Sequence, residues 1–263
     1  MKITSVHNPK ILALRKLYKS NERKNSEVFI AEGKKEVERG ILSGFEAVSV
    51  YYSSDIINKK DLESIVSKVE KNTLFSDLDR NVYEKVAYRD NTEGILAVFR
   101  KRNSILEDIS VGSNDIFVIL ESIEKPGNLG AILRSADAAG VKAIILTESK
   151  VDQYHPNVIR SSLGAVFEIP VINSSNLKVF EWLKHNDIRI YSAALPSYKG
   201  LFDLNLSGNI SLIFGAESEG LSEFWFRNSD EIFTIPMKGI VDSLNVSVSV
   251  AISLYEALRQ GRV

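Results

Sequence analysis

Three loop-like segments of this sequence gather small and polar residues directly after apolar runs that look like strands. They are residues 124–136, 214–222 and 235–247. Glycine occurs in all three, and a glycine lets the backbone approach a ligand closely or adopt a positive φ angle. We expect the chemistry in these loops, where Asn128, Arg134, Glu217 and Glu219 are among the side chains able to bind a ligand or move a proton.

Each of these side chains, taken alone, also has an ordinary structural explanation. Asn128 is as well placed to cap the helix that follows as to take part in catalysis. Arg134 lies off the apolar stripe of that helix, so a solvated position would also suit it. Glu217 and Glu219 could be two surface carboxylates. Single residues therefore leave both interpretations open.

Several kinds of chemistry are excluded or disfavoured by what the sequence lacks. Without cysteine there are no disulfides, thiolate metal sites or thiol nucleophiles, and the three histidines are too far apart for a short metal-ligand spacing, so we expect no metal. Gly127 and Gly130 resemble the start of a dinucleotide-binding fingerprint, but Leu133 stands where its third glycine belongs. A Walker lysine and a Gly-x-Ser-x-Gly elbow are also missing.

Alternating strand-like and helix-like patterns predict the elements that position these loops. The unbroken apolar run 116–120 is typical of a strand buried on both faces, and residues 129–140 show helical spacing of apolar residues. The further strands expected are 143–146, 189–192 and 211–214, with a helix near 176–185. Such βα alternation predicts a parallel sheet covered by helices, whose ligands bind at the carboxyl ends of the strands.

A polar stretch at residues 101–114 predicts a domain boundary. Before it, strand-like runs at 28–31, 47–51 and 95–99 alternate with helical stretches at 33–43 and 61–71. We therefore expect a smaller α/β domain over residues 1–102 and a second domain over residues 115–263.

Basic residues gather near the N-terminus, although the 263-residue chain has a formal net charge of −1. Residues 1–30 carry seven lysines and arginines against two glutamates, and a second basic cluster covers residues 100–102. Such patches attract phosphate, although a solvated helix face explains the charge equally well. The residues expected to contact nucleic-acid phosphate are Lys10, Arg15, Lys16, Lys19, Arg23 and Lys24.

The N-terminal sequence contains no apolar run long enough for a signal peptide, and no segment approaches the length of a membrane-spanning helix. We therefore expect a cytoplasmic protein that does not associate with membranes.

In their order and content, the three loops together resemble the signature motifs of the SpoU (TrmH) family of RNA 2′-O-ribose methyltransferases, within the SPOUT class. The resemblance runs through most of residues 116–260, including 160–165 and 254–260. Residues 1–100 more loosely resemble the family's ribosomal-protein-like substrate-binding domain, notably at residues 29–33. The implied fold is an α/β protein in which a trefoil-knotted, parallel-sheet methyltransferase domain follows a smaller α/β substrate-binding domain.

The resemblance also changes the structure expected after residue 243. Residues 243–250 alternate strictly between polar and apolar, which by periodicity alone predicts a strand. The family instead has a loop here, followed by a long helix from about Asn245. We adopt the helix, because a buried helix of serine, valine and alanine also fits these residues.

By resemblance, the protein transfers a methyl group from S-adenosylmethionine to a ribose 2′-hydroxyl. Arg134 matches the residue that the family credits with activating the hydroxyl. It could act as a base, although a guanidinium keeps its proton above pH ~12, or as a phosphate-binding fork that positions the ribose. The family's other polar site positions match Asn128, Glu217, Ser243 and Asn245.

The resemblance implies that main-chain groups hold most of the S-adenosylmethionine, at positions matching Gly215, Ile235 and Leu244, with Ala193 or a neighbour. It also implies a homodimer with the site near the subunit interface. The ribosomal-protein-like first domain favours ribosomal RNA over transfer RNA. Two alternatives are a catalytically silent RNA-binding or ribosome-assembly protein, and a nicotinamide-dependent oxidoreductase, which the broken glycine fingerprint disfavours.

Overall fold

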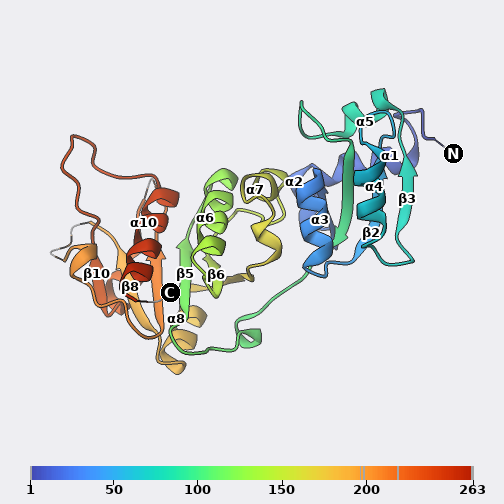
Figure 1. Ribbon diagram of the computed structural model, residues 1–263. Coiled ribbons are helices and arrows are strands. Elements are labelled where there is room, and N and C mark those ends of the chain that lie inside the picture. The colour runs from blue at the N-terminus through green and yellow to red at the C-terminus, as the bar shows by residue number, and fades with distance from the viewer. Residues whose placement is uncertain (1, 196, 198, 218, 262–263) are drawn as a thin grey trace. The chain divides into compact units, whose positions relative to one another are not determined.

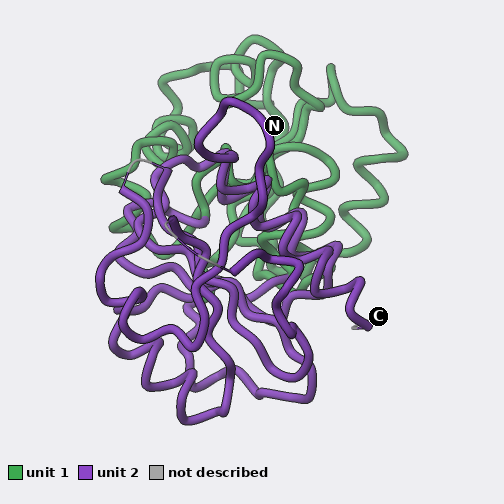
Figure 2. The backbone as a smooth tube through the Cα atoms, turned by 90° about the vertical axis from the view of Figure 1, so that its left-hand side faces the viewer, with its two compact units in different colours: residues 1–102, 154–168 green, residues 103–153, 169–263 purple. Residues whose placement is uncertain are grey.

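The computed structural model describes residues 2–195, 197, 199–217 and 219–261, which form two compact units (Figure 2). The first unit comprises residues 1–102 and 154–168, and the second comprises residues 103–153 and 169–263. Each unit contains its own sheet (Figure 1).

The first unit is built on a four-stranded sheet in the order β1-β4-β2-β3. Strand β4 pairs antiparallel with both β1 and β2, while β2 and β3 are parallel. The strands are β1 (Val28–Glu32), β2 (Ala47–Tyr52), β3 (Leu74–Asp77) and β4 (Ile95–Arg100). The helices are α1 (Pro9–Leu17), α2 (Ser20–Lys24), α3 (Lys34–Leu42), α4 (Lys59–Val66) and α5 (Arg80–Val86).

Residues 154–168 pack with the first unit although they lie between two strands of the second unit in the chain. They include helix α7 (Pro156–Ser161) and the 3-10 turn η2 (Ala165–Phe167). The Tyr154 ring stacks on Phe29 with centroids 4.1 Å apart, and Phe167 meets Phe45 edge-on at 5.2 Å. Because these aromatic contacts hold the segment, the compact units do not follow the two continuous ranges expected from the sequence.

The second unit contains a six-stranded sheet in the order β10-β8-β9-β5-β6-β7, with every neighbouring pair parallel. The strands are β5 (Ile116–Glu121), β6 (Ala143–Thr147), β7 (Val171–Ser174), β8 (Arg189–Ala193), β9 (Ile210–Phe214) and β10 (Glu231–Phe233). Every residue of β5 is buried, as expected for a central strand covered on both faces. The predicted parallel α/β fold is confirmed.

Helices cover this sheet and complete its core. They are α6 (Pro126–Ala138), α8 (Asn176–His185), α9 (Glu223–Asn228) and α10 (Val246–Arg259), with 3-10 turns η1 (Leu106–Asp108) and η3 (Leu201–Asp203). Val179 and Leu183 of α8 and Trp225 of α9 pack in one cluster with inward residues of β5, β6, β8 and β9. Helix α10 packs against α6 and β9 (Figure 1).

The helix expected from about Asn245 is confirmed, and the strand that alternation predicts is wrong. Asn245 is the N-cap of α10, and its side chain accepts a hydrogen bond from the Ser247 amide. The buried positions Val246, Val250 and Leu254 recur every four residues, which is the spacing of one helix face. The serines and valines alternate in sequence, but burial follows the helical period.

No helix within the described residues is long and apolar enough to cross a membrane.

Candidate active site

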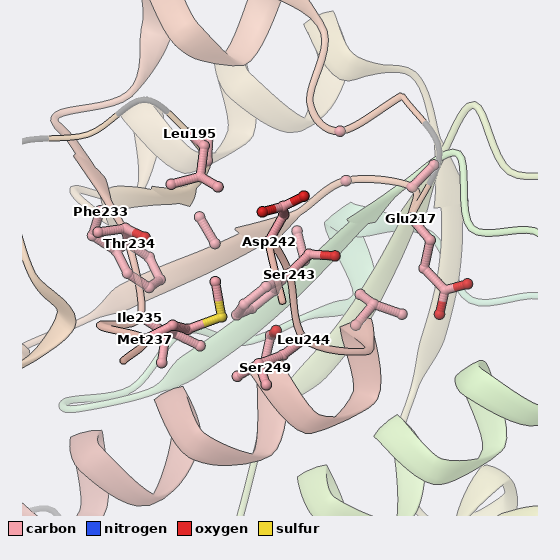
Figure 3. Close-up of a pocket in the computed structure, with 17 residues that line it drawn as sticks. Leu195, Glu217, Phe233, Thr234, Ile235, Met237, Asp242, Ser243, Leu244 and Ser249 are labelled. Carbon is pink, nitrogen blue, oxygen red and sulfur yellow. The ribbon is translucent and has the colours of Figure 1, made fainter. Parts of the chain in front are cut away.

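A pocket of about 270 Å³ opens at the carboxyl ends of β8, β9 and β10, in the second unit (Figure 3). We call it the main pocket. Its lining comes from the residues after these strands and the start of α10: Ala193, Ala194, Leu195, Phe214, Gly215, Ala216, Glu217, Gly220, Phe233, Thr234, Ile235, Met237, Asp242, Ser243, Leu244, Val246 and Ser249. The four expected cofactor positions, Gly215, Ile235, Leu244 and Ala193, are all among them.

Gly215 begins a tight turn in the wall of the main pocket. The chain reverses between Ala216 and Gly220, which form an isolated antiparallel bridge. A Cβ atom on Gly215 would lie 2.1 Å from the Gly220 carbonyl oxygen, so no side chain fits there without moving the backbone. The glycine is therefore required by close packing of two backbone segments, which sets the shape of this wall.

The three sequence motifs meet at the carboxylate of Glu217, beside the main pocket. Its Oε1 accepts hydrogen bonds from the side-chain amides of Asn128 at 2.9 Å and Asn245 at 2.5 Å. Its Oε2 is paired with the Lys125 ammonium. The Asn245 amide also lies 3.3 Å from Asn128 Oδ1, its acceptor. One carboxylate therefore ties together the loop after β5, the loop after β9 and the start of α10.

This arrangement favours the charged form of Glu217. The Lys125 ammonium lowers the pKa of the carboxyl most, and the hydrogen bond from the Asn128 amide and the backbone hydrogen bond with Val246 lower it further. The electrostatic arrangement suits a fixed hydrogen-bond acceptor rather than a group that releases or takes up a proton near neutral pH.

Asn128 does not cap α6, so that interpretation is wrong. The helix begins at Pro126, its N-cap residue is Lys125, and no side chain makes a capping hydrogen bond there. Asn128 therefore lies in the first turn, where its amide is free to reach Glu217. Asn245, by contrast, does cap a helix, while its amide nitrogen donates to Glu217.

The structure does not bring Arg134 into this network. Arg134 is exposed on α6, off the buried stripe formed by Leu129, Ile132, Leu133 and Ala136, as the sequence predicts. It is not part of the pocket lining, and its side chain makes no hydrogen bond or ion pair with the residues that the structure describes.

Ser243, in contrast, lines the main pocket. Sequence reasoning missed two residues here, Lys125 and Asp242. Lys125 directly precedes Pro126 in the first motif and Asp242 directly precedes Ser243 in the third, but neither residue's type or spacing sets it apart from a surface charge.

Five of the six basic residues expected to contact RNA are exposed in the first unit. They are Lys10, Arg15, Lys16, Lys19 and Lys24, which we call the N-terminal basic patch. Arg23 is a correction, because its side chain is buried, with the residue only 1% exposed. Its guanidinium donates to the carbonyl oxygens of Leu17 and Tyr18 at 3.2 and 3.1 Å, at the end of α1. Arg23 therefore has a structural role and is not available to phosphate.

Among the described residues, no group of three or more histidine, cysteine, aspartate or glutamate side chains is arranged to hold a metal ion.

The fold and the site define the class of protein. Residues 115–255 match the model of the SpoU rRNA Methylase family, and the chain belongs to that family. Residues 8–97 match the MRM3-like substrate binding domain.

Named relatives are similar to part of this chain in sequence. The chain is 39% identical over 152 residues to the 23S rRNA (guanosine-2′-O-)-methyltransferase of Xylella fastidiosa, a match that covers 57% of this chain and 61% of that protein. The enzyme of the same name from Escherichia coli K12 is 36% identical over 161 residues, covering 61% and 66%. The match therefore spans less than two thirds of either relative.

Several solved structures match nearly the whole chain, including the following two. The AdoMet-bound rRNA methyltransferase of Sinorhizobium meliloti aligns with a TM-score of 0.91 and 28% identity, covering 99% of this chain and 98% of that one. A structure described as an RNA 2′-O ribose methyltransferase aligns with a TM-score of 0.87 and 34% identity over the full length of both chains.

Proposed function

We propose that this protein transfers a methyl group from S-adenosylmethionine to a ribose 2′-hydroxyl of RNA. The observation that carries the proposal is the meeting of the three motifs at Glu217, next to a pocket lined by all four positions expected to hold the cofactor. Membership of the SpoU family and the names of the aligned methyltransferases support the same reaction.

The main pocket fits a nucleoside with a charged tail. Phe214, Phe233 and Met237 offer apolar surface for a base, while Gly215 and Leu244 line the pocket at positions where main-chain contacts to the cofactor are expected. When bound, the cofactor supplies a methyl group on a sulfonium, which is an excellent leaving group. The chain's own residues must therefore hold the acceptor oxygen in line with that methyl group, and alignment of this kind supplies about 7–11 kcal/mol of a reaction barrier.

Arg134 is the proposed residue for positioning or activating the acceptor. Because no described residue pairs with its guanidinium, the planar fork is free to bind a phosphate of the RNA. The alternative role as a base needs a strongly perturbed arginine, since a guanidinium ordinarily keeps its proton above pH ~12. Asn128, Glu217, Ser243 and Asn245 would complete the polar side of the site.

The proposed substrate is ribosomal RNA, with transfer RNA second. The curated relatives act on 23S rRNA, and the first unit matches a substrate-binding domain and carries the N-terminal basic patch. We propose that the protein acts in the cytoplasm as a homodimer, whose mass can be measured by sedimentation equilibrium.

The direct test is methyl transfer from isotope-labelled S-adenosylmethionine to ribosomal RNA and, separately, to transfer RNA. Digestion of the RNA to nucleosides should give a labelled 2′-O-methylnucleoside, with more label in ribosomal RNA. Label on a base would contradict the proposed acceptor. Cofactor binding without transfer to either RNA would favour the catalytically silent RNA-binding protein.

A further inference from the structure

Two carboxylates line the main pocket, Glu217 and Asp242, and their surroundings differ. The charge of Glu217 is compensated by the Lys125 ammonium and by two side-chain amides. Asp242 makes no hydrogen bond or ion pair with any residue that the structure describes. Asp242 is therefore the carboxylate whose charge the described residues leave uncompensated.

The rest of the lining offers no positive charge. Its described members apart from the two carboxylates are apolar residues, glycines, one threonine and two serines. Figure 3 shows the Asp242 side chain next to Ser243 near the centre of the view, while the Glu217 carboxylate lies farther to the right. A ligand in the main pocket therefore experiences a negative potential from the Asp242 carboxylate.

We propose that Asp242 makes the main pocket favour a cationic methyl donor over its neutral product. The proposal rests on the proposed function, because it takes S-adenosylmethionine as the donor. In the transfer, the carbon–sulfur bond to the methyl group breaks, a carbon–oxygen bond to the ribose forms, and the hydroxyl proton passes to solvent water. The sulfur keeps the electron pair and becomes a neutral thioether.

The donor and the product are otherwise the same molecule. Adenine, ribose and the amino acid group occur in both, so a carboxylate in the pocket lining distinguishes them mainly by the positive charge on the donor's sulfur. Asp242 therefore strengthens binding of the donor and loses this attraction once the methyl group has left, which favours release of the product.

The size of the effect follows from Coulomb's law. At a separation of roughly 7 Å and an effective dielectric constant of about 40 to 80, one charge pair changes affinity about three- to sevenfold. This range is modest, because Asp242 is exposed, but binding measurements can resolve it.

The experiment compares three ligands by isothermal titration calorimetry: S-adenosylmethionine, S-adenosylhomocysteine and sinefungin, an analogue with an amine cation in place of the sulfonium. With Asp242→Asn, the Kd of S-adenosylmethionine and of sinefungin should rise about three- to sevenfold, while that of S-adenosylhomocysteine changes less than about twofold. Asp242→Glu keeps the charge and should keep most of the preference for the cations.

The matched control is Glu181→Gln, which removes an exposed carboxylate of α8 outside the pocket lining. It should leave all three Kd values unchanged. An equal loss for all three ligands in Asp242→Asn would overturn the proposal, because Asp242 would then hold a group that donor and product share. An unchanged set of Kd values would overturn it as well. If the wild-type protein bound none of the three ligands, the result would contradict the proposed function itself, not only the role of Asp242.

Discussion

Arg134 and Asn128 belong to the same helix, yet their side chains have different surroundings. Asn128 donates to Glu217 at 2.9 Å, whereas Arg134 is exposed and without a partner among the described residues. An exposed arginine contributes little to the fold, so its replacement isolates a functional effect from a structural one.

Arg134→Ala should leave the fold and the cofactor affinity nearly unchanged, because no buried volume is lost and Arg134 lies outside the pocket lining. The free energy of unfolding should change by less than about 0.5 kcal/mol. The single-turnover rate of methyl transfer with saturating RNA should fall by about 10²-fold or more, the scale for removing a group that assists proton transfer. A wild-type rate would remove Arg134 from the mechanism.

Arg134→Lys separates the two proposed roles of the charge. If the planar guanidinium is required, Arg134→Lys should lower the methyl-transfer rate nearly as much as Arg134→Ala. A smaller loss of rate would show that only the positive charge is required. The melting temperatures of both variants serve as the control, and a large drop would return Arg134 to a structural role.

At the scale of elements, the Lys125–Glu217 pair joins the start of α6 to the loop after β9, and Asn245 adds the start of α10. A cation at a helix N-terminus opposes the helix dipole, so helix stability does not explain Lys125. The ion pair with Glu217 explains Lys125 instead. The ammonium lowers the pKa of the Glu217 carboxyl and so keeps this hydrogen-bond acceptor charged.

The pairing predicts a pH dependence for cofactor binding. Lys125 is the main cause of the lowered pKa of Glu217, so the carboxyl stays charged until the pH falls through this lowered value, and cofactor affinity that depends on the charge should fall there too. Lys125→Met should raise the pKa of Glu217 and move the acid loss of cofactor affinity to higher pH. Titrations of Kd against pH measure this shift.

Lys178→Met provides the control, because it removes an exposed lysine of α8 that is not part of the pocket lining. It should retain the wild-type pH profile. If cofactor affinity fell at the same acidic pH in Lys125→Met and in the wild type, Lys125 would not control the charge of Glu217.

At the scale of the whole molecule, each unit has its own candidate role: the first carries the N-terminal basic patch and the second the main pocket. The two roles should therefore respond separately to substitution.

Replacing the five residues of the N-terminal basic patch by glutamine should weaken RNA binding and flatten its salt dependence. Each lost phosphate contact reduces the slope of log K against log salt by about 0.7–0.9. Cofactor affinity should survive, since the main pocket lies in the second unit. Filter binding at several salt concentrations gives the slope.

The control for the patch is the pair Lys60→Gln and Lys71→Gln, exposed lysines of the first unit outside the patch. An equal slope in the patch variant and the control would show the patch to be a solvated surface. Arg23 is kept in both proteins, because its buried guanidinium supports the end of α1.

The sequence by itself determined the parallel sheet, four of its six strands and the three motif loops. These features are local in origin: an unbroken apolar run such as residues 116–120 requires burial on both faces wherever it lies in the chain. Resemblance added the helix from Asn245 and the identity of the polar site residues. The knot that the resemblance implies stays a prediction.

Only the tertiary structure decided which side chains meet. Lys125, Asn128, Glu217 and Asn245 lie up to 120 residues apart in sequence, and periodicity carries no information about contacts at that distance. Burial of Arg23 was hidden for a different reason, because its guanidinium binds the nearby backbone carbonyls of Leu17 and Tyr18, and backbone groups have no sequence signal. Likewise, residues 154–168 joined the first unit through aromatic stacking with Phe29 and Phe45, a choice set by packing rather than by chain order.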